Sequence, residues 1–112
     1  MRLKKPEKMN DSENWSVDDI KNGDIVVYEA EDLFTWIIIF EEWYKPYEGH
    51  MHYYALLVYP NTLWVNSTCF LLDEESLRPA TEEEKQDLFK VMQKERYKWD
   101  EENKKVIKID KQ

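Results

Sequence analysis

Two histidines placed two residues apart are the first feature of this sequence that could take part in chemistry. His50 and His52 lie in a segment rich in strand-forming residues. Side chains two apart on a strand point to the same face, so both imidazoles could bind one zinc ion. A zinc site needs at least a third protein ligand, which Glu48 or Cys69 could supply only through a tertiary contact. We therefore expect two imidazoles at a strand edge, with no metal and no cofactor.

Cys69 is the single cysteine, and beside His52 it has the composition of a thiol nucleophile with its base. It lies in the apolar segment 68–72, however, where a cysteine is usually a buried and unreactive residue. No set of residues supplies a nucleophile, a base and an orienting group together, so we expect a protein that is not an enzyme. A small metal- or thiol-dependent hydrolase using His50, His52 and Cys69 is the alternative from the enzyme class.

Length and composition favour one intracellular domain. A chain of 112 residues fits a single domain. Its two glycines are too few for a phosphate-binding loop. One cysteine excludes an internal disulfide and fits a reducing cytoplasm. The basic start of the chain has no apolar run behind it, as a secretory signal would, and no stretch is apolar enough to cross a membrane.

Charge is unevenly distributed along the chain. The net charge is −8, and residues 11–48 hold eleven acids against two lysines. Residues 49–72 contain no Asp, Glu, Lys or Arg, which is typical of the buried centre of a fold. Stacking sites for single-stranded nucleic acid require a positive groove, so the acidic body makes direct nucleic-acid binding unfavourable.

The centre of the chain predicts antiparallel strands at 24–30, 34–44 and 50–59, with shorter ones at 62–66 and 69–72. The second and third of these are apolar on both faces, whereas a sheet with one solvated face would alternate. The sheet must therefore close on itself or be covered. We expect an α+β protein with a small, strongly bent antiparallel sheet or SH3-like barrel in a β-rich core at 24–72. An OB-like barrel is the nearest alternative.

A helix and a hairpin are expected to follow the sheet. Thr81 and Glu84 form a capping box, which predicts a helix over 82–95. A β-hairpin is expected over 97–109. Residues 1–12 should form a flexible tail, and residues 13–112 a single domain. The helix residues expected to face the sheet are Leu88, Phe89 and Met92.

The C-terminal third also carries a resemblance. The run LRPATEEEKQ at 77–86, Leu88-Phe89, and then Tyr97-Lys98-Trp99-Asp100 resemble the tail of a family of small proteins from phages and mobile elements of gut anaerobic bacteria. The GDIVV segment at 23–27 resembles the same family more loosely. Many relatives place Gly where this chain has Arg96, a position that favours glycine after a helix. The resemblance implies only a phage- or mobile-element-derived protein with a shared scaffold, because the family supplies no activity that can be carried over.

Aromatic residues exceed what a core of this size needs. Five Trp and seven Tyr are present, and both residue types are enriched at protein interfaces. One helix and closure of the barrel cannot cover every strand face. The alternative is that the segment with Trp15, Val17 and Ile20 folds back and covers the rest. The residues expected to remain uncovered, and to form an interaction surface, are Trp36, Trp43, Tyr44, Tyr53 and Trp64.

These observations favour a non-enzymatic accessory protein acting by protein–protein contact. Its partner would be another protein or a second copy of the chain, with no role for a membrane. An acidic inhibitor that imitates nucleic acid, and so occupies a DNA- or RNA-binding protein, is the alternative among binding proteins. Negative charge alone is a weak argument for such a decoy, because it also confers solubility.

Overall fold

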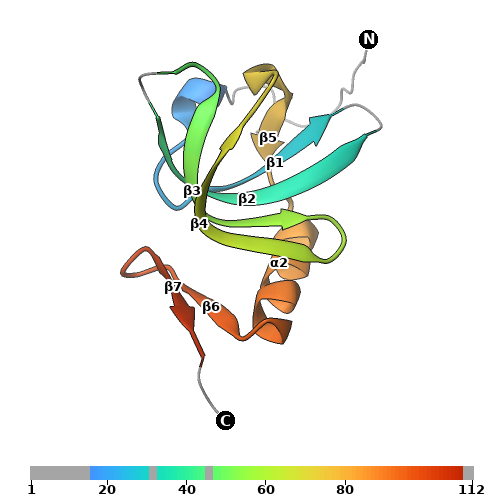
Figure 1. Ribbon diagram of the computed structural model, residues 1–112, viewed down its shortest axis with the longest axis vertical. Coiled ribbons are helices and arrows are strands. Elements are labelled where there is room, and N and C mark those ends of the chain that lie inside the picture. Colours follow the sequence, from blue (N-terminus) through green and yellow to red (C-terminus); the bar gives the residue numbers. More distant parts are fainter. Residues whose placement is uncertain (1–15, 31–32, 45–46, 110–112) are drawn as a thin grey trace.

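Five antiparallel strands form one sheet in the computed structural model, which describes residues 16–30, 33–44 and 47–109. The strand order is β4-β3-β2-β1-β5, and the sheet curves strongly through β3 and β4 (Figure 1). The predicted bent antiparallel sheet is confirmed, but the sheet is not closed into a barrel, because β4 and β5 end it on opposite sides. The strands are β1 (Ile25–Ala30), β2 (Phe34–Trp43), β3 (His50–Val58), β4 (Thr62–Phe70) and β5 (Leu77–Pro79).

Two strand boundaries differ from the expectation. A single strand, β4, replaces the two expected at 62–66 and 69–72. It stays in register with β3 from Thr62 to Phe70 and ends before Leu71. Asn66 adopts a positive φ of 51°, and the strand bends there instead of ending. The sheet also extends past residue 72, because β5 pairs with β1 through Leu77 and Tyr28.

Both faces of the sheet are buried, as the two-sided apolar pattern of β2 and β3 requires. Neighbouring residues of one strand belong to different cores: Ile38 lies in the first and Ile37 in the second. The first core consists of Val26, Tyr28, Ile38, Phe40, Met51, Tyr53, Leu56, Leu71 and Leu77. The second consists of Val27, Ile37, Ile39, Ala55, Leu57, Leu88 and Met92.

The first face is covered partly by the segment before β1. Ser16 caps a short 3-10 helix, η1 (Val17–Asp19), through a capping box with Asp19. Val17 and Ile20 are half-buried against the first core, so this segment does act as a lid. Trp15 and the expected flexible tail at 1–12 lie outside the described residues.

The second face is covered by the helix and the C-terminal hairpin, as Figure 1 shows. Helix α2 (Glu82–Lys94) buries Leu88 and Met92, with Phe89 half-buried beside them. Thr81 caps it with both hydrogen bonds of the predicted capping box. The helix stops at Lys94, one residue before the expected end. The predicted hairpin is present as β6 (Tyr97–Asp100) and β7 (Lys105–Lys108).

Arg96 joins the helix to the hairpin in a left-handed conformation, with φ 72°. Glycine would take this conformation without steric cost. The Arg96 carbonyl accepts the amide of Ile109 at 2.7 Å, and the Arg96 amide donates to the Gln93 carbonyl at 3.0 Å. These hydrogen bonds stabilise the chain reversal although the Arg96 side chain makes the left-handed conformation less favourable than it would be for glycine.

Arg78 of β5 ties the sheet to the start of α2. Its guanidinium contacts the Glu84 carboxylate at 2.7 Å and the Glu29 carboxylate at 3.3 Å. Burial alone would raise the pKa of Glu84, but the hydrogen bonds from Arg78 and Thr81 outweigh it and hold the pKa below its usual range. Glu84 therefore contributes stability above pH values near 4.5 that is lost as pH falls through its lowered pKa.

We predict that Thr81→Ala lowers the free energy of unfolding by about 1 kcal/mol, the usual cost of removing an N-cap side chain. Glu83→Ala is the matched control, because Glu83 lies in the same helical turn, is exposed and has no part in the capping box. Urea unfolding measures both. Equal midpoints for Thr81→Ala and the parent would show that the cap contributes nothing to stability.

Candidate interaction surface

The two histidines lie at the start of β3 on the side away from Cys69. His52 pairs with Thr68 in the register, whereas Cys69 pairs with Met51. Met51 belongs to the first core and Cys69 is half-buried against it, and adjacent strand residues face opposite sides of a sheet. The geometry therefore does not bring Cys69 and His52 together as a nucleophile and base.

The candidate metal ligands do not converge either. Within 16–30, 33–44 and 47–109, no group of three His, Cys, Asp or Glu side chains is placed to hold a metal ion. His50 packs against the ring of Phe70, with 4.7 Å between centroids, and His52 packs edge-on to Tyr44 at 5.4 Å. Both imidazoles are part of an aromatic cluster.

The five aromatic residues expected on one surface are dispersed. Tyr53 is buried in the first core. Trp36 is half-buried and stacks on Phe34 at 4.9 Å, and Trp43 is half-buried with its ring edge-on to Phe40 at 5.3 Å. The two exposed members are Tyr44, 39% exposed, and Trp64, 56% exposed.

Tyr44 and Trp64 belong to different regions. Tyr44 follows β2 and contacts His50 and His52 near the β2–β3 connection. Trp64 lies on β4 opposite Leu56, toward the other end of β3. Sequence reasoning missed the exposed apolar residues that accompany them, although several flank turns where such exposure is common. These are Leu33, Tyr47, Tyr59, Phe70, Leu72 and Ile109.

Strand β4 is the most distinctive exposed element. It ends the sheet on one side, so one of its long edges pairs with β3 and the other pairs with no strand of the described chain. None of its nine residues is charged, although edge strands are usually protected by Lys or other charged side chains, or by Pro. Trp64 and Phe70 are both about half exposed along it.

Comparison with known proteins identifies no relative: no family model, no curated protein and no solved structure matches the chain. Among the described residues, no helix is both long and apolar enough to cross a membrane.

Cys69 is predicted to react slowly in the folded protein. Burial raises the pKa of its thiol to about 12, and the thiolate is the reactive form. Labelling with iodoacetamide should therefore be much slower in the native protein than in urea-unfolded protein at pH 8. The native rate should keep rising with pH beyond 9, because the thiolate fraction is still growing. A native rate equal to the unfolded rate would contradict this burial.

Proposed function

We propose that the protein is a non-enzymatic accessory protein that binds another protein chain. In the complex, an extended segment of the partner pairs with the β4 edge. The observation that carries the proposal is an uncharged, nine-residue edge strand whose second side pairs with no strand in 16–30, 33–44 or 47–109. An unpaired edge presents a row of backbone N–H and C=O groups that an extended segment can satisfy. In such strand addition, main-chain hydrogen bonds supply affinity and alternate side chains supply specificity.

The distribution of charge supports this edge as the contact. Residues 49–72 are uncharged in a chain of net charge −8, so a partner approaching β4 meets little repulsion from the strand itself. Trp64 offers exposed aromatic area on the strand, and buried Trp residues often dominate binding energy. The sheet faces are less suitable surfaces, because both are already packed within the chain.

We also propose that the sheet is an open SH3-like arrangement. Strand β5 supports this proposal. It follows the 3-10 helix η2 (Glu74–Ser76) directly in the chain, is the last strand of the sheet and pairs with β1. An origin in a phage or mobile element is proposed from the tail at 77–100. A cytoplasmic location is proposed because a free cysteine fits a reducing compartment.

We predict that Thr68→Lys abolishes partner binding. Thr68 is exposed and is the third residue from the end of β4. Lysine on an edge strand opposes further pairing because its charge would be buried. Gln86→Lys, which adds the same charge on the exposed surface of α2, is the control. Affinity capture from an extract of the source organism, quantified by mass spectrometry, compares the three proteins.

We expect the unsubstituted protein and Gln86→Lys to capture the same partner protein, and Thr68→Lys to fail to capture it. Sedimentation equilibrium of the purified parent decides whether that chain is a second copy. Retention of the same partners by Thr68→Lys would contradict the edge-strand proposal. A substrate-dependent reaction catalysed by the purified protein would contradict the non-enzymatic one.

A further inference from the structure

A cleft of about 340 Å³ opens where β4 ends, beside the β2–β3 connection. Leu71 lies buried among its lining residues, while Phe70 and Leu72 are 48% and 83% exposed. The Leu72 amide donates to the Tyr28 hydroxyl at 3.2 Å, which fixes this wall to the sheet. The other lining residues are Glu48, Gly49, Asp73, Glu74 and Glu75.

Gly49 and Glu74 shape the opposite wall. The Gly49 amide donates to the Glu74 carboxylate at 3.0 Å, and Gly49 has a positive φ of 78°. A Cβ atom there would lie 2.7 Å from the Leu71 carbonyl oxygen, so only glycine fits. The cleft is therefore built by specific contacts between the β2–β3 connection and the segment after β4.

Aromatic rings extend from the cleft along the surface. Phe70 packs on His50 at 4.7 Å, and His50 packs on Tyr47 at 5.4 Å. Tyr47 in turn contacts Tyr44 at 5.6 Å. Tyr47 is 59% exposed and Phe70 is 48% exposed, so both residues remain partly accessible to a ligand.

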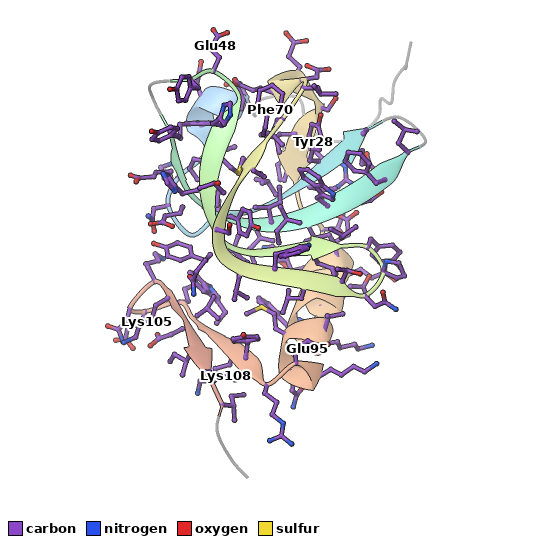
Figure 2. The ribbon with its side chains drawn as sticks, viewed as in Figure 1. Tyr28, Glu48, Phe70, Glu95, Lys105 and Lys108 are labelled. Atoms are coloured by element: carbon purple, nitrogen blue, oxygen red, sulfur yellow. The ribbon has the colours of Figure 1, made fainter. Side chains whose placement is uncertain are left out.

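Among the described residues, every charged side chain that lines the cleft is acidic. Four carboxylates line the cleft, and residues 47–77 contain no Lys or Arg. The next basic residue, Arg78, is already bonded to Glu29 and Glu84. The exposed Lys105 and Lys108 lie at the far end of the molecule from Glu48 and Phe70 (Figure 2).

We propose that this cleft binds an arginine side chain in a basic segment of a partner protein. Aromatic faces attract cations. A planar guanidinium can stack on a ring while donating to carboxylates, which a lysine ammonium does less well. In this arrangement the guanidinium covers Phe70, and its donors reach Glu48 and Glu75. The site does not require pairing along β4, so either proposal can fail alone.

The test uses nitrogen-15 NMR spectra of the full chain titrated with amidated hexa-arginine. Shifts should concentrate at Glu48, Gly49 and residues 70–75. Glu48→Gln combined with Glu75→Gln should weaken binding roughly fivefold to tenfold, because exposed ion pairs each contribute little. Phe70→Ser should weaken it as well. Glu83→Gln with Glu102→Gln, two exposed carboxylates away from the cleft, removes the same charge and serves as control.

Hexa-lysine should bind more weakly than hexa-arginine at the same salt concentration. The proposal would be overturned if the cleft and control variants weakened peptide binding equally, or if the shifts spread over every acidic segment. Either result would instead fit an acidic protein that imitates nucleic acid without a defined site. Absence of binding would overturn the proposal too. Spectra of the protein without peptide should not change with protein concentration. Concentration-dependent shifts at the cleft and at Lys105 and Lys108 would show that a second copy of the chain occupies the site, which would contradict binding of a different partner protein.

Discussion

The rest of the structure depends on one constraint: the central strands are apolar on both faces and must be covered twice. Ile38 belongs to one core and Ile37 and Ile39 to the other. Burying side chains of this size contributes about 1.5–3 kcal/mol each, so neither face can remain in water. Helix α2 and the hairpin cover one face, while bending of the sheet and the segment before β1 cover the other.

Covering both faces determines where the remaining exposed apolar surface lies. The Arg78–Glu84 contact fixes α2 against β5, and the capping box begins the helix at that point. Trp99 of the hairpin then packs on Tyr54 at 5.0 Å, extending the cover beyond the helix. Much of the exposed aromatic surface then lies on β4 and in the aromatic cluster where β4 ends, which is why both proposals concern that side.

Local patterns predicted the elements well, because they depend on neighbouring residues. The capping box at Thr81 and the two-sided strands are both encoded within a few positions. Tertiary features were harder to predict. Strand β5 is three residues long and exists only because β1 offers a free edge, and Asn66 bends β4 where composition suggested a gap. Burial of Tyr53 and dispersal of Trp36, Tyr44 and Trp64 depend on sheet curvature, which the sequence pattern does not specify.

Residue-resolved hydrogen exchange of the dilute protein tests the central claim most directly. A sheet covered on both faces should exchange the amides of Ile37, Ile38 and Ile39 only through global unfolding. Along β4, slow amides bonded to β3 should alternate with fast amides on the unpaired edge. Fast exchange at the three isoleucines would contradict the two-sided core. Uniformly slow exchange from Thr62 to Phe70 would show that the chain itself covers the edge on which the proposed function depends.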